Sequence, residues 1–205
     1  MRSRFLPDAD PLRMDVYVEI DRTGDLRLSE DQGERLVETF ADAPVENPGN
    51  RTGIALHLFR NDTLPPVGVL NESTFYRYRE NRADRSCMGY HYAVLAPGAN
   101  FADGTDRDVT GGAATLGGGA FASEASTFTF LHEFGHSLGL DHGPDVPYSA
   151  YPSAMNYNIR QARYDFSNGT ASAQDRDDWA YLQEQMATQS VSYFSDPFVT
   201  NCTGP

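Results

Sequence analysis

The sequence predicts one α+β domain whose N-terminal half has the order of an α/β protein. At 205 residues the chain can bury one core and is short for two domains of ordinary size. Residues 14–21 alternate apolar and mostly polar side chains, which is the period of a strand. A helical stripe follows, and 53–59 is a second short apolar run. Because strand, helix and strand follow one another through short links, we expect a parallel pair of strands joined by a right-handed crossover.

The elements of the N-terminal half follow in order. The strand at 14–21 ends at the turn sequence RTGDL. Ser29 and Gln32 then form a capping box, and the helix they begin has an apolar stripe that stops before Pro44, namely Leu36, Val37, Phe40 and Ala41. The stretch 65–85 is hard to assign, although STFYRYREN could carry a helical turn. Residues 88–96 are a third predicted strand.

Two helices are predicted in the C-terminal half. The first spans 123–139 and is apolar nearly all round, so it should be buried. A Pro-rich loop at 143–152 separates it from the sequence SAMNYNIR. The last helix runs from about 172 to 186, where Trp179, Leu182 and Met186 recur at helical spacing. The chain shows no internal repeat and no linker that would mark a domain boundary.

The charge of the chain limits its partners. A net charge of −13 argues against nucleic acid, because binding the phosphate backbone requires a basic surface. No apolar run approaches the roughly 20 residues that span a bilayer, so membrane insertion is not expected. All 16 basic residues are Arg, which together with the acidic excess resembles proteins adapted to high salt. GC-rich codon usage with an ordinary acidic surface explains the same composition equally well.

The cysteines and the N-terminal sequence do not decide whether the protein is exported. Cys87 and Cys202 match no zinc or redox spacing, and they could form one bridge or remain thiols. The start, MRSRFLPDADPLRMD, lacks the apolar region of a signal peptide, while several N-x-S/T sequons weakly favour export. We therefore expect either a protein that stays inside the cell or one whose export segment precedes this start.

The stretch LHEFGHSLGLDHG, at 131–143, carries the strongest chemical pattern. His132 and His136 are four residues apart, so they share one face of a helix and can hold one metal ion. Glu133 points about 100° around the axis, which suits a base that acts on water beside the metal. Gly139 can adopt positive φ and turn the chain so that His142 reaches the same ion. Three imidazoles leave one position open, as in a catalytic zinc site.

A buried helix with ordinary core histidines is the competing interpretation of this stretch. Burying two imidazoles and a carboxylate without partners would cost several kcal/mol. A bound metal removes that cost, and Gly139 and His142 follow at the spacing that a third ligand requires. The pattern therefore favours a metal site.

HEFGHSLGLDH resembles the extended zinc motif HExxHxxGxxH of the metzincin metallopeptidases, and SAMNY resembles their Met-turn. The resemblance implies zinc ligands at His132, His136 and His142, with Glu133 as general base. It also implies that Met155 forms an apolar floor beneath the metal. Tyr157 matches the tyrosine that astacin-like and serralysin-like members place near the zinc, where a phenol could ligate the resting metal or donate to the oxyanion.

The same resemblance implies an architecture. It is a twisted mixed β-sheet with a backing helix, an active-site helix and a C-terminal helix, with an upper part at about 1–139 and a lower part at about 140–205. The Gly-rich stretch 110–122 would supply an edge strand that pairs with an extended peptide substrate, although a flexible surface loop is an equal alternative. Gly143 differs from what astacins, adamalysins or serralysins would show, and the SxMNY turn is most similar to pappalysin-like and related prokaryotic members.

The sequence therefore predicts a zinc-dependent endopeptidase. The alternative is a catalytically idle, zinc-stabilised module that binds peptides without cutting them. A calcium site on the acidic loop lacks support, because its carboxylates miss the spacing of a calcium-binding loop and favour a solvated loop, namely Asp103, Asp106 and Asp108. His57 and His91 lie on predicted strands and are expected to be ordinary half-buried residues.

Overall fold

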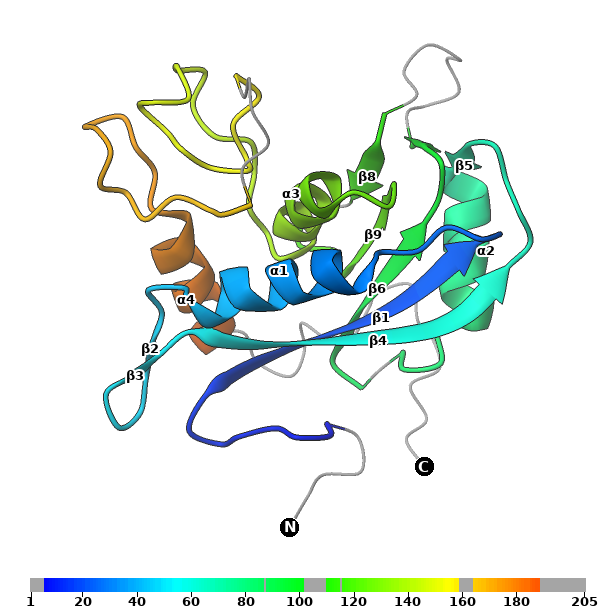
Figure 1. Ribbon diagram of the computed structural model, residues 1–205, viewed down its shortest axis with the longest axis horizontal. Helices are drawn as coiled ribbons and strands as arrows, with labels where there is room; N and C mark the ends of the chain where they lie inside the picture. Colours follow the sequence, from blue (N-terminus) through cyan, green and yellow to red (C-terminus); the bar gives the residue numbers. More distant parts are fainter. Residues whose placement is uncertain (1–5, 87, 102–109, 115, 159–163, 189–205) are drawn as a thin grey trace.

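The computed structural model describes residues 6–86, 88–101, 110–114, 116–158 and 164–188. Figure 1 shows a twisted sheet crossed by helices. The helices are α1 (Glu30–Ala41), α2 (Glu72–Arg82), α3 (Thr127–Ser137) and α4 (Asp178–Thr188). The main strands are β1 (Met14–Thr23), β4 (Ile54–Leu64), β6 (Tyr90–Leu95), β8 (Gly112–Ala114) and β9 (Ala120–Ser123). Two short pairs complete the set, made of β2 (Glu46–Asn47) with β3 (Arg51–Thr52) and of β5 (Leu70–Asn71) with β7 (Ala99–Asn100).

The main sheet has five strands in the order β4-β1-β6-β9-β8. β1 pairs in parallel with β4 on one side and with β6 on the other, and β6 pairs in parallel with β9. Only the pairing of β8 with β9 is antiparallel within this sheet. The predicted parallel pair is confirmed, and the α+β class with a mixed sheet is confirmed as well.

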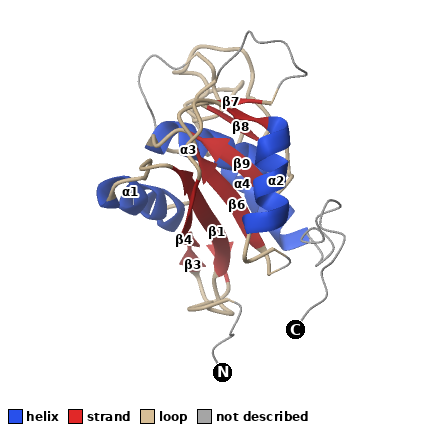
Figure 2. Cartoon of the chain, turned by 90° about the vertical axis from the view of Figure 1, so that its right-hand side faces the viewer, coloured by secondary structure: helices blue, strands red, loops and turns tan. Residues whose placement is uncertain are grey.

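Helices cover both faces of the sheet. Figure 2 shows α1 and α3 on one face and α2 on the other. Successive residues of a strand face opposite sides, so the sheet can supply side chains to a core on each face. Val16, Val18 and Ile20 enter the core under α1 and α3, while the neighbouring β6 contributes Tyr92 and Val94 to a second core under α2. The sheet therefore separates two cores, one on each face.

Helix α1 begins as the sequence predicts. The Ser29 side chain accepts from the Gln32 backbone N–H, and the Gln32 side chain accepts from the Ser29 N–H, so both halves of the capping box form. Leu36 and Phe40 from the predicted stripe are buried against the sheet. The crossover between β1 and β4 is therefore a helix fixed by its own cap and its apolar face.

The boundaries of three helices differ from the sequence predictions. Helix α3 begins at Thr127, because Ser123 still pairs with Leu95 at the end of β9 and Ser126 is the N-cap. Residues 72–82 form the complete helix α2, which begins at the N-cap Asn71. Helix α4 begins at Asp178 instead of 172, after a loop of turns. For α3 and α4, a paired strand or a loop of turns occupies residues whose helical spacing alone gave no stop signal.

The Gly-rich stretch forms a hairpin and not a flexible loop in its described part. Its first half contains the edge strand β8, and its second half contains the inner strand β9. No helix in the described part of the chain combines the length and apolar character that crossing a bilayer requires.

Aromatic side chains join the sheet region to the segments that follow α3. Phe40 of α1 contacts Phe134 of α3 with ring centroids 5.4 Å apart, and it meets the Trp179 ring edge-on at the same distance. Phe166 contacts both Phe40 and Trp179. These four residues belong to one buried cluster, so the ligand-bearing helix shares its core with α4.

Candidate metal centre

Two of the three histidines project from α3. The Ser126 side chain accepts from the Thr129 N–H at the start of this helix, which fixes where it begins. His132 and His136 then lie one turn apart, and their Nε2 atoms are 3.2 Å apart. Both side chains are largely withdrawn from solvent. The helix therefore brings two ring nitrogens together on its surface, as the four-residue spacing predicts.

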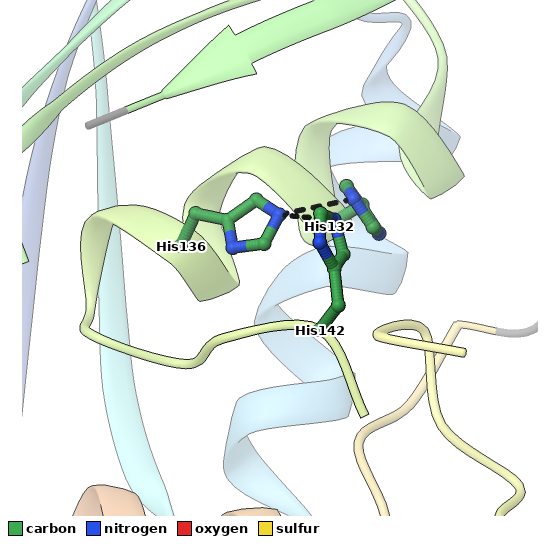
Figure 3. Close-up of side chains that lie close together, drawn as sticks. All are labelled: His132, His136 and His142. Carbon is green, nitrogen blue, oxygen red and sulfur yellow. Dashed lines mark hydrogen bonds between the residues drawn. The ribbon is translucent and has the colours of Figure 1, made fainter. Parts of the chain in front are cut away.

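The third histidine arrives on the loop that leaves the helix. Gly139 has φ 101°, a conformation that L side chains rarely adopt, and its N–H donates to the carbonyl of His136. The chain turns there and returns to place the Nε2 atom of His142 2.9 Å from that of His136. Figure 3 shows the three rings converging, two from the helix and one from the loop below it. Their ligand atoms all lie within 4.8 Å of one another.

Backbone carbonyls set the orientation of the first two rings. His132 Nδ1 lies 2.8 Å from the carbonyl oxygen of Ala154, and His136 Nδ1 lies 2.7 Å from that of Leu140. A carbonyl only accepts, so each Nδ1 carries the proton and each Nε2 presents a lone pair. Two lone pairs that face each other at 3.2 Å repel unless a cation lies between them. This donor set fits a divalent metal ion that prefers imidazole nitrogen.

Burial keeps these imidazoles neutral. Burial, followed by repulsion from His132, lowers the pKa of His136 to about 4. Burial also lowers the pKa of His132 and that of His142. Neutral rings are the form in which histidine binds metals.

Glu133 follows His132 on α3 and is also buried. Among the described residues none donates a hydrogen bond to its carboxylate, and burial raises its pKa to about 8. Its side-chain stem rests against the edge strand, because a Cβ placed on Gly112 of β8 would lie 2.4 Å from the Cγ of Glu133. The side chain is thus held between the helix and the strand, and its oxygens accept no hydrogen bond from the described residues.

Met155 and Tyr157 follow on the loop below the helix. Met155 is fully buried, and its Sδ lies so close to α3 that a Cβ on Gly135 would be 2.6 Å from it. Tyr157 is 73% exposed, and its ring centroid is 4.1 Å from that of His142. Met155 therefore packs against the helix at Gly135, between His132 and His136 in the sequence, and Tyr157 lies on the exposed side of His142.

A family model for peptidase M66 matches residues 78–183, just over half of the chain. The chain belongs to the peptidase M66 family. The matched part of this M66 chain includes the three histidines and the segment that carries Met155 and Tyr157. The prediction of a metzincin-like metallopeptidase is confirmed, whereas the pappalysin-like subfamily stays a prediction.

The fold of this M66 member is similar to a solved structure. The crystal structure of metalloproteinase-II from Bacteroides fragilis matches with a TM-score of 0.53 and 17% identity. The match covers 87% of this chain and 55% of that one, so the M66 chain spans about half the length of that structure. A comparison with curated proteins gives no match.

Other predicted residues of the M66 chain lie away from the metal centre. His91 is buried, not half-buried as expected, because its Nδ1 hydrogen-bonds to the Ser137 hydroxyl at 2.8 Å inside the core under α3. His57 is partly exposed and hydrogen-bonds to Asp15 at 2.7 Å. Both cysteines and the acidic loop lie outside the described residues, namely Cys87, Cys202, Asp103, Asp106 and Asp108.

The sequence pattern did not single out the residues that brace the loop around His142. These are Tyr151, Ser153, Arg176 and Asp178. The one available signal was the arginine and paired aspartates at 176–178, just before the helical stripe of α4, which could also have been read as an ordinary acidic helix start.

Proposed function

We propose that this chain is a zinc-dependent endopeptidase. His132, His136 and His142 would hold the ion through their Nε2 atoms. Zinc is favoured because three neutral imidazoles with room for a further ligand are typical of catalytic zinc sites. When bound, the ion supplies a Lewis acid that polarises the scissile carbonyl and lowers the pKa of water toward about 7. The convergence of the three Nε2 atoms is the observation that carries this proposal.

Glu133 is proposed as the general base. A cation held by the neighbouring histidines favours the ionised carboxylate over the protonated form that burial alone favours. The carboxylate then takes a proton from the water that attacks the peptide carbonyl. As the C–N bond breaks, Glu133 returns this proton to the leaving amine. The absence of a competing donor among the described residues supports this role, because the carboxylate is available to water and substrate.

Tyr157 is proposed to stabilise the oxygen on which negative charge develops. Its ring stacks near His142 at the exposed mouth of the site. Burial and the neighbouring Glu133 carboxylate raise the pKa of Tyr157, so its hydroxyl keeps its proton and can donate a hydrogen bond.

The substrate is proposed to be a peptide or protein segment in extended conformation. β8 is the edge of the main sheet and lies directly over Glu133. An extended peptide that adds to an edge strand uses main-chain hydrogen bonds, which brings its scissile bond alongside that strand. A peptide bound in this way would have its reacting carbonyl next to the proposed base.

Zinc content and cleavage of a mixed peptide library test the proposal. Wild type is compared with Glu133→Gln, and Glu34→Gln on the exposed face of α1 is the matched control. We expect about one zinc ion per chain in all three proteins, with cleavage lost only in Glu133→Gln. Zinc binding without cleavage in wild type would favour the idle peptide-binding module. Zinc-free protein after reconstitution would refute the zinc site.

A further inference from the structure

The loop that carries His142 is held by the side chain of Arg176. Its Nη2 donates to the carbonyl oxygen of Asp141 at 2.8 Å, and its Nη1 donates to that of His142 at 3.3 Å. Arg176 follows His142 by 34 residues in the sequence and approaches it from the segment before α4. The guanidinium thus fixes two successive carbonyl groups at the third histidine of the site.

The remaining donors of Arg176 reach the buried carboxylate of Asp178 and the hydroxyl of Tyr151. Its Nε donates to Asp178 Oδ1 at 2.6 Å, and its Nη2 also donates to the Tyr151 hydroxyl at 2.8 Å. Asp178 is fully buried, whereas the Arg176 side chain is 31% exposed. The planar fork of an arginine can satisfy these acceptors together, which a lysine ammonium cannot do with the same geometry.

Asp178 extends the same network to the Met-turn. Its carboxylate accepts from the Tyr151 hydroxyl and from the Ser153 hydroxyl. The Ser153 oxygen in turn accepts from the Met155 N–H at 3.0 Å. One buried carboxylate therefore connects the loop of His142 with the turn whose Ala154 carbonyl orients His132.

Gly143 allows these parts to come together. A Cβ on this residue would lie 1.6 Å from a ring carbon of Tyr151, so only glycine leaves room for the ring against the chain after His142. The Gly143 N–H donates to the carbonyl of Met155 at 3.0 Å. The residue that departs from the astacin, adamalysin and serralysin patterns is thus explained by the tyrosine packed against it.

We propose that Arg176, anchored by Asp178 and Tyr151, is a positioning residue that holds His142 in place for metal binding. Arg176 does not touch the three converging nitrogens, and it acts through the backbone at Asp141 and His142. The inference rests on the proposed zinc site, because positioning a ligand matters only where a metal is bound. Groups that orient metal ligands typically change metal affinity by about 10-fold to 100-fold when they are removed.

The test compares Arg176→Gln with Arg60→Gln. Arg60 is a matched control, because its guanidinium also donates to two successive carbonyl groups, those of Leu28 and Ser29, far from the site along the chain. Zinc dissociation constants are measured by competition with a chelating dye, and hydrogen exchange of 141–157 is measured in the metal-free proteins. We expect Arg176→Gln to weaken zinc binding by about 10-fold or more and to speed exchange in this segment. Arg60→Gln should change neither.

Further variants distinguish a loss of zinc affinity from a loss of folding. Tyr151→Phe keeps the ring against Gly143 and removes only the hydroxyl, which accepts from Arg176 and donates to Asp178. Because the direct bond from Arg176 to Asp178 remains, we expect a smaller loss of zinc affinity in a folded protein. Arg176→Lys keeps the positive charge but lacks the planar fork of donors, so its zinc affinity should stay as low as that of Arg176→Gln. Zinc affinity within about twofold of wild type and unchanged exchange in Arg176→Gln would overturn the inference. If wild type itself binds no zinc, the proposed function fails, and the exchange of 141–157 still decides whether Arg176 holds the loop.

Discussion

The backbone of Gly112 lies directly against the side chain of Glu133. A Cβ on Gly112 would be 2.4 Å from the Cγ of Glu133 and 2.8 Å from the carbonyl oxygen of Ala122 on the paired strand. Neither neighbour can shift without cost, since one is the stem of a buried carboxylate and the other is sheet backbone. The edge strand therefore sets the position of the proposed base, and its lack of a side chain at this point is a requirement of the site.

Gly112→Ala should separate catalysis from metal binding. The added methyl group displaces Glu133, and a misplacement of about 1 Å can cost about 100-fold in rate. We expect peptide cleavage to fall at least tenfold while zinc content stays at the wild-type level, because the histidines come from α3 and its following loop. Gly68→Ala is the control, since nothing lies within 4 Å of its Cβ. Unchanged cleavage in Gly112→Ala would show that the contact does not position the base.

Removing the metal should lower stability. A ligand that binds only the folded state at about 100 times its dissociation constant stabilises it by about 2.7 kcal/mol. We expect zinc to raise the melting temperature of the chelator-treated protein, and His136→Ala to abolish this rise. His57→Ala serves as control, because His57 binds Asp15 outside the three-histidine cluster. A full zinc shift in His136→Ala would place the stabilising site elsewhere.

His91 should make stability depend on pH in the acid range. Burial, with a smaller contribution from Arg79, lowers the pKa of His91 from 6.5 to about 4. The folded state therefore prefers the neutral ring. This preference contributes stability that is fully present above about pH 6.5 and is lost as the pH falls through about 4.

Urea unfolding of the metal-free protein at about pH 7 and about pH 4.5 measures this contribution. We expect wild type to lose on the order of 2 kcal/mol more than His91→Gln between the two pH values. Gln cannot become charged, so the variant loses only what the other groups contribute. Equal losses in the two proteins would mean that His91 titrates alike in the folded and unfolded states.

Salt should stabilise the chain if its acidity is an adaptation to salt. The net charge of −13 produces self-repulsion, and raising the ionic strength from about 0.05 M to about 1 M shortens the screening length to about 3 Å. We expect the melting temperature to rise over this range at constant pH. A parallel series with sucrose separates charge screening from general exclusion of a cosolute. A flat or falling melting temperature in salt would favour the codon-usage explanation of the composition.

The metal centre could be predicted because its histidines fall within one short stretch. A four-residue spacing and one glycine fix where His132, His136 and His142 must meet, and no distant contact is needed. The first strands and α1 could be predicted for the same reason, since the capping box and the apolar stripe are local signals. The formation of these elements therefore depends little on contacts with the rest of the chain.

The parts that could not be predicted depend on contacts between distant residues. The bonds from Arg176 run from a side chain to backbone carbonyls, which carry no residue-specific signal in the sequence. Helix α2 was hard to assign because its aromatic and arginine side chains alternate without one apolar face, and its burial comes from packing under the second core. Tertiary packing decided both cases.

The aromatic cluster of Phe40, Phe134, Phe166 and Trp179 links the helix that carries two of the histidines to the helix that begins at Asp178. α3 supplies two histidines and packs on this cluster. α4 packs on it as well, and its first residue, Asp178, anchors the Arg176 side chain that holds the loop of His142. Movement of α3 away from α4 would therefore expose these shared apolar rings to water. We therefore expect the histidine site to open only when this core loosens, so a substitution of Phe40 on α1, which offers no ligand, would change how long a metal ion stays bound.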